Sequence, residues 1–133
     1  MEITKYAYKT TVNLSFEGAV QKVTEELKRE GFGVLTEIDV KGTLKKKLDA
    51  DFRKYKILGA CNPPNAYKAL QAEIDIGLML PCNVVVYEGE GGATVVAAVD
   101  PVASMRAVEN PGLEATALEV RRKLQRVIEA IEQ

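Results

Sequence analysis

Two cysteines, each followed directly by an asparagine, are the side chains of this sequence best suited to chemistry. They occur in the segments Cys61-Asn62-Pro63 and Pro81-Cys82-Asn83, so each lies beside a proline where an extended segment changes direction. A cysteine reacts as its thiolate, and a helix beginning after Asn62 would present its positive end to Cys61 and favour that form. The alternative is that both cysteines are small buried apolar side chains. Asn62 is then either a ligand contact or a helix cap, and Asn83 is a candidate for a side chain that faces a cleft.

Two acidic residues form a second candidate group. Glu37 and Asp39 lie two apart in an alternating segment, so in a strand they would project from the same face. A third acid beside them would complete a magnesium site or a general-base pair, but nothing in the sequence identifies that third ligand. The alternative is an exposed strand face, and we therefore predict no metal site.

A basic segment between Lys41 and Lys56 is the third candidate. It contains seven lysine or arginine residues against Asp49 and Asp51, which gives it a net charge of +5 and leaves −6 on the rest of the chain. Such a segment can hold a phosphate or a nucleic-acid backbone. Lysines on a short exposed helix usually serve solubility, and few aromatic residues interleave with these, so nucleic-acid binding is not expected.

The residue types that are absent exclude several chemistries. The sequence has no histidine, which rules out Ser-His and Cys-His catalysis and every histidine-ligated metal site. The cysteines are 21 positions apart, a spacing that matches neither a Cys-x-x-Cys redox motif nor a zinc knuckle. The glycine-rich segment 89–92 is not a phosphate loop, because no Lys-Ser/Thr pair follows it and Glu88 and Glu90 would repel an anion. No cofactor can be named from these residues.

The strands that must position these residues follow from the apolar pattern. Alternating or strongly apolar segments predict strands at residues 6–14, 33–40, 55–61, 83–88 and 93–99. The last two are joined by the glycine-rich loop and are expected to form a hairpin. Their runs of valine suggest strands that are covered on both faces.

Helical spacing predicts the remaining elements. Ser15 would cap the first helix and Gly31 would end it, while Thr43 would cap a short second helix. Another helix begins after Asn62, and its inner face is predicted to consist of Ala66, Tyr67, Leu70 and Ile74. Asn110 would begin the last helix. Its apolar stripe consists of Leu113, Ala117, Val120, Leu124, Val127 and Ile131.

Length and composition indicate one globular domain over residues 1–133. Apolar residues make up 47% and charged residues 28%, with no sign of disorder or of a disulfide scaffold. The N-terminal segment lacks the apolar core of a signal peptide, and no run approaches the ~18 apolar residues of a membrane span. We expect a cytoplasmic protein with free thiols and no membrane partner. Its fold class is α+β, with a mainly antiparallel sheet covered by helices.

Three segments taken together resemble a known family. They are GFGVLTEIDVKGTLKKKL at 31–48, KILGACNPPNAYKAL at 56–70 and DIGLMLPCNVVVYE at 75–88. Above all the pairing of Gly-Ala-Cys-Asn-Pro with Leu-Pro-Cys-Asn-Val is similar to the bacterial and archaeal family known as domain of unknown function 302, over nearly the whole chain.

This resemblance implies a compact α+β domain like the TATA-box-binding-protein fold, β-α-β(4)-α, with short helices added after Lys41 and after Asn62. It implies no catalytic residue and no activity, since function depends on the site and not on the topology. The motif residues of the family that occur in this chain are Glu37, Asp39, Cys61, Asn62, Pro63, Pro81, Cys82 and Asn83.

Hypotheses of different classes follow. The first is a small ligand-binding or interaction module, forming a homodimer, with its site where the two Cys-Asn steps meet the acidic face of Glu37 and Asp39. The second is a thiol-dependent enzyme or redox sensor with Cys61 or Cys82 as nucleophile. The third is a purely structural dimer, joined through an exposed strand edge or the C-terminal helix stripe. The sequence leaves open whether the protein is an enzyme.

Overall fold

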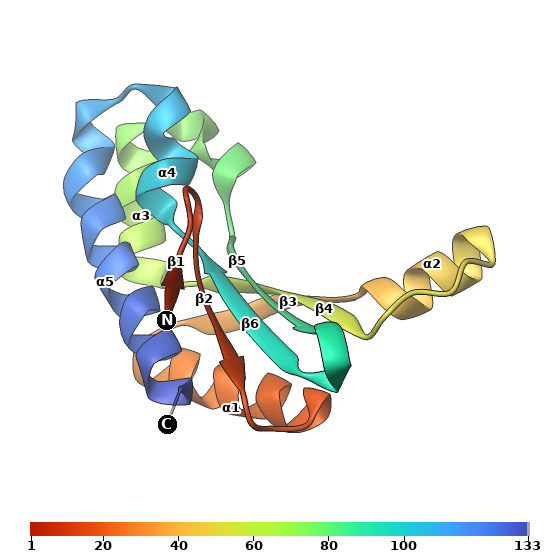
Figure 1. Ribbon diagram of the computed structural model, residues 1–133. Helices are drawn as coiled ribbons and strands as arrows, with labels where there is room; N and C mark the ends of the chain where they lie inside the picture. The colour runs from red at the N-terminus through yellow and green to blue at the C-terminus, as the bar shows by residue number, and fades with distance from the viewer. Residues whose placement is uncertain (133) are drawn as a thin grey trace.

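The chain forms a six-stranded antiparallel sheet with long helices packed against one of its faces (Figure 1). The computed structural model describes residues 1–132. The strand order is β1-β2-β6-β5-β4-β3, so β1 and β3 are the two edges of the sheet. The strands are β1 Glu2–Ile3, β2 Ala7–Val12, β3 Gly33–Asp39, β4 Tyr55–Cys61, β5 Cys82–Glu88 and β6 Thr94–Val99.

Within residues 1–132, five α-helices and four short 3₁₀ helices accompany the strands. The α-helices are α1 Phe16–Arg29, α2 Val40–Leu48, α3 Pro63–Ala72, α4 Pro101–Met105 and α5 Glu114–Ile131. The 3₁₀ helices are η1 Ile74–Met79, η2 Glu90–Gly92, η3 Arg106–Val108 and η4 Pro111–Leu113. Without the small elements β1, α2, α3 and α4, the order reads β-α-β(4)-α, which confirms the α+β prediction. Within residues 1–132 no helix combines the length and the apolar character needed to cross a membrane.

The two long helices form where the sequence predicts them. Ser15 Oγ accepts a hydrogen bond from the Gly18 N–H at 3.0 Å, which caps α1, and Gly31 follows this helix with a φ of 85°. Asn110 caps the turn that leads into α5, accepting from the Gly112 N–H at 2.8 Å. All six residues of the predicted C-terminal stripe are buried.

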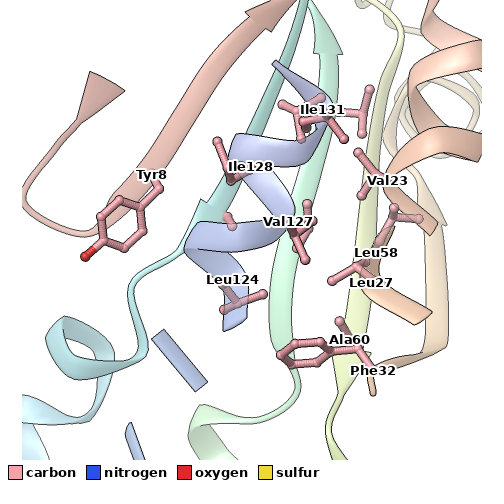
Figure 2. Packing of buried hydrophobic residues seen from close by; sticks show 14 of the residues in the cluster. Tyr8, Val23, Leu27, Phe32, Leu58, Ala60, Leu124, Val127, Ile128 and Ile131 are labelled. Carbon is pink, nitrogen blue, oxygen red and sulfur yellow. The ribbon is translucent and has the colours of Figure 1, made fainter. Parts of the chain in front are cut away.

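The core lies between the inner face of the sheet and the helices α1 and α5 (Figure 2). Leu58 from β4 and Tyr8 from β2 pack there with Leu27 of α1 and Leu124 of α5. Each aliphatic side chain buried in this way contributes on the order of 1.5–3 kcal/mol to folding. This layer fixes the ends of β4 and β5, from which the cysteines project.

The outer face of the sheet carries no helix, so the prediction of strands covered on both faces is wrong. Along β5 the inner residues Val84 and Val86 are buried, whereas Asn83 is exposed and Val85 and Tyr87 are half-buried. Two long helices are enough to cover only one face of six strands. The open face holds a hollow of about 290 Å³ in which the rings of Tyr55 and Tyr87 stack 5.2 Å apart.

The helix α2 is capped by Asp39 and not by Thr43. The Asp39 carboxylate accepts from the Gly42 N–H at 3.0 Å, so α2 begins directly at the end of β3. Aspartate is a stronger cap than threonine, and its position three residues before Gly42 suits the bond. None of the α2 side chains is buried, and the helix extends away from the body of the protein (Figure 1).

The inner face of α3 also differs from the prediction. Asn65 and Ala69 are buried, whereas Tyr67, Leu70 and the following Ile74 are exposed and Ala66 is half-buried. The apolar residues alone predict the wrong buried face for α3. The hydrogen bond of Asn65 in the first turn sets which side of the helix faces the protein interior. The apolar side chains are thereby left on the surface.

Candidate functional site

A cavity of about 310 Å³ lies where the end of β4 and the start of β5 meet α3, η1 and α5. Four of the residues singled out in the sequence line it, namely Cys61, Asn62, Pro81 and Cys82. The other lining residues are mostly apolar and are Phe32, Leu35, Ala60, Asn65, Ala66, Ala69, Leu70, Gly77, Leu80, Met105, Thr116, Ala117 and Val120. The cysteines of the two Cys-Asn pairs are therefore close in space.

The two cysteines are free thiols in different surroundings. The register of β4 and β5 pairs Ala60 with Cys82, which places Cys61 one residue from that pair. Burial raises the pKa of Cys82 to about 11, and the neighbouring Cys61 adds to this effect. Cys82 is therefore a neutral thiol at neutral pH and a poor nucleophile. Cys61 is half-buried, directly before α3.

Asn62 occupies the cap position of α3, but its side chain does not cap the helix. Its Nδ2 donates to the backbone carbonyl of Glu30 at 3.2 Å, and its Oδ1 accepts from Nδ2 of Asn65 at 2.9 Å. Asn62 thus ties the residue that follows α1 to the first turn of α3. This tether differs from both roles that the sequence suggested, the ligand contact and the helix cap.

Asn65 is the residue of this site that the sequence analysis missed. Its side chain is only 4% exposed and lines the cavity. Its Nδ2 is used by Asn62, and within residues 1–132 its Oδ1 is the one buried side-chain polar atom without a hydrogen-bond partner. An unpaired buried acceptor costs about 1–3 kcal/mol, so its retention requires an explanation. Residues three apart on a helix share a face, and this spacing from Asn62 was the available signal.

Several apolar side chains of β3, α3 and η1 are in contact with solvent. We call them the rim and define it as Leu35, Tyr67, Leu70, Ile74, Leu78 and Met79, all of them exposed. Leu35 and Leu70 also line the cavity itself. The other four belong to α3 and η1, two elements that contribute to the cavity wall.

The acidic pair lies away from the cavity. Lys56 Nζ approaches Glu37 Oε1 at 2.9 Å, and Asp39 caps α2. The register sets Gly33 opposite Cys61, so Asp39 is six residues further along β3, about 20 Å at roughly 3.3 Å per residue. Among residues 1–132 no group of three or more Cys, Asp or Glu side chains could hold a metal ion.

Asn83 also lies outside the cavity. Successive residues of a strand face opposite sides, so Cys82 is buried on the helix side and Asn83 lines the hollow of the open face.

Pro63 occupies the exposed first position of α3. Pro81 follows a cis peptide bond and packs on Gly59, where a side chain would overlap Thr36 and lie 2.7 Å from the proline ring.

The cavity is suited to binding and poorly equipped for acid–base catalysis. Its lining contains no Asp, Glu, Lys, Arg or Tyr side chain, so its titratable groups are the two thiols. The walls offer apolar contact, and the unpaired Oδ1 of Asn65 is buried within this lining. The basic segment lies on and around α2 and does not line this cavity.

Comparison with known proteins supports this architecture without assigning an activity. The chain is similar to an uncharacterized conserved DUF302 protein from Bacillus stearothermophilus, whose crystal structure superposes with a TM-score of 0.89 at 29% identity, covering 96% of this chain and 99% of that one. No curated protein matches the chain. The model of the family described as domain of unknown function DUF302 matches residues 8–131. The match spans most of the sequence, and the chain therefore belongs to the DUF302 family.

Proposed function

We propose that this protein binds a small, largely apolar molecule that carries one hydrogen-bond donor, and that this molecule occupies the cavity beside α3. The observation that carries the proposal is the unpartnered Oδ1 of Asn65, buried in the lining of an otherwise apolar cavity. We further propose that residues 1–133 act as one domain, in a cytoplasmic homodimer. Neither nucleic acid nor a membrane is a partner in this proposal.

The size and chemistry of the cavity support this function. A volume of about 310 Å³ lies at the lower end of the range for small-molecule sites, roughly 300–1,000 Å³. Such sites are lined by apolar groups, with a small number of polar atoms that orient the ligand. A ligand N–H or O–H bonded to Asn65 Oδ1 would remove the cost of leaving that oxygen unpaired, which is about 1–3 kcal/mol.

The sequence offers a direct test, because the chain contains no tryptophan. Indole fluorescence can therefore be followed with light that tyrosine does not absorb. Indole carries an N–H donor, whereas benzofuran has nearly the same shape and carries an oxygen acceptor in its place. Since about 1.4 kcal/mol corresponds to a tenfold change in affinity, a cost of about 1–3 kcal/mol predicts that indole binds roughly 5- to 150-fold more tightly than benzofuran, measured by competition.

The relative affinities for indole and benzofuran decide the proposal. The variant Asn83→Leu is the control, because Asn83 is an exposed asparagine outside the cavity. The Asn83→Leu protein should keep the preference for indole. Equal binding of the two compounds by the wild type, or binding of neither, would overturn the proposed ligand chemistry.

A thiol-dependent reaction is the second candidate, and the raised pKa of the buried Cys82 thiol supports Cys61 as its nucleophile. This residue is half-buried in the cavity wall, and only Asn62 separates it from α3. Thiol labelling of the native protein, resolved by mass spectrometry, tests it. Rapid labelling of Cys61 would support an electrophilic substrate, whereas protection of Cys61 until the protein unfolds would remove this candidate.

A further inference from the structure

We propose that two copies of this chain pair through β3 and that the arm of each copy covers the cavity of the other. We define the arm as α2 with the following residues 49–54. This inference rests on the proposed homodimer and specifies its interface. It does not depend on the identity of the ligand.

The free edge of β3 is the first observation. β3 is seven residues long, whereas the opposite edge strand β1 has two. An edge strand presents a row of unpaired N–H and C=O groups, and proteins usually protect such a row with lysine, proline or a covering element. β3 contains neither lysine nor proline and exposes 68% of Leu35 and 46% of Ile38. It does carry two acids and a register shift near its middle, but Glu37 is paired with Lys56 and Asp39 caps α2. β3 is therefore equipped to pair with another strand.

The arm is the second observation. A nine-residue helix is marginal in water without tertiary packing, and α2 buries none of its residues within its own chain. The arm also carries apolar side chains into solvent, since Leu48 is 71% exposed and Phe52 is 41% exposed. A surface outside this chain must cover the arm for these features to be stable.

The geometry of an antiparallel pair connects the two observations. When β3 pairs antiparallel with its copy around Thr36, the Gly33 end of one strand lies beside the Asp39 end of the other, with the irregularity between Val34 and Thr36 inside the pair. The chain of the partner then continues into its α2 beyond the Gly33 end of the first copy. That end carries the cavity, because the register places Gly33 opposite Cys61 and because Leu35 lines the cavity. The apolar residues of the arm thus reach the apolar rim.

The charges of the two surfaces are complementary. The basic segment 41–56, which contains most of the arm, carries a net charge of +5, and the remaining residues carry −6. Two acids are neighbours of rim residues in the sequence, since the exposed Asp75 follows Ile74 and Glu73 precedes it. A second copy offers a matching strand edge, an apolar rim and acidic residues at once. It is therefore the occupant that fits the arm.

Light scattering coupled to size exclusion tests the interface. The wild type should have twice the monomer mass of 14.6 kDa at micromolar concentration. Ile38→Lys places a charge on the proposed edge and should give a monomer with an unchanged circular dichroism spectrum. Ile3→Lys is the matched control on the other edge strand, and it should remain a dimer.

A second variant keeps the test decisive if Ile38→Lys fails to fold. Leu48→Lys changes a side chain that makes no core contact, and it should weaken the dimer at least tenfold while leaving thermal unfolding of the monomer unchanged. A monomeric wild type would overturn the homodimer and this interface together. The same conclusion would hold if the arm of that monomer bound an acidic peptide or DNA. A wild-type dimer that neither variant weakens would overturn this interface alone and leave the homodimer standing.

Discussion

Replacement of Asn65 by leucine separates a binding role of this residue from a structural one. In the free protein the variant removes the unpaired Oδ1, which relieves a cost of about 1–3 kcal/mol. It also removes the bond at 2.9 Å from Asn65 Nδ2 to Asn62 Oδ1 and leaves that oxygen unpaired, at a similar cost. The two effects offset each other, and leucine has a similar size. We therefore expect the free energy of unfolding to change by less than about 1.5 kcal/mol.

Ligand binding by the same variant should change much more. Without Oδ1 the cavity loses the unpaired acceptor proposed to receive the ligand N–H group, so the preference for indole over benzofuran should disappear. Urea denaturation measures the free energy of unfolding, and indole fluorescence with competing benzofuran measures the preference. A variant that keeps its stability and loses a ligand contact is the expected signature of a residue retained for function.

The opposite pair of results would refute this reasoning. If Asn65→Leu lowers the free energy of unfolding by about 3 kcal/mol or more and leaves the preference for indole intact, Asn65 serves the fold alone. The unpaired oxygen would then be satisfied by water in the folded protein, and the cavity would lose its assigned ligand.

Three further predictions concern two residues of the cavity wall, Asn62 and Cys82, and Gly59 of the adjoining strand β4. Asn62→Ala should lower the free energy of unfolding by about 2–4 kcal/mol in urea denaturation, because it leaves the Glu30 carbonyl and Asn65 Nδ2 unpaired; a loss below about 1 kcal/mol would contradict the tether. Gly59→Ala should cost about 1–3 kcal/mol in the same assay, because its side chain would overlap Thr36 and crowd Pro81, and wild-type stability would contradict that contact. The pKa of Cys82 is raised from 9.0 to about 11, so its contribution to stability is complete below pH 9 and is lost as pH rises to about 11. The wild type should therefore lose about 3 kcal/mol more than Cys82→Ala over that interval, and equal losses would show that Cys82 is not held as a buried thiol.

The strand boundaries and the C-terminal helix could be predicted because their signals are local. The spacing of four and three residues from Leu113 to Ile131 specifies one helix face, and all six predicted residues are buried. The order of the strands is a tertiary property, and no local pattern places β3 at a free edge. The orientation of α3 was mispredicted for a related reason, since a polar residue is buried there by a hydrogen bond formed after folding.

The candidate site was predictable in part. The repeated Cys-Asn step pointed to Cys61, Asn62 and Cys82, and the cavity does bring these residues together. The two-residue period of a strand is enough to predict that Asn83 and Cys82 face opposite sides of the sheet. The distance of Glu37 and Asp39 from the cavity depends on the register of β3 and β4, which the sequence does not specify.

A crystal structure of the protein with indole is the most direct test of the central claim. The account predicts indole in the cavity beside α3, with its N–H donating to Oδ1 of Asn65 at about 3.0 Å. Indole bound in the hollow of the open face near Tyr55 and Tyr87, or bound in the cavity with its N–H directed away from Asn65, would contradict it.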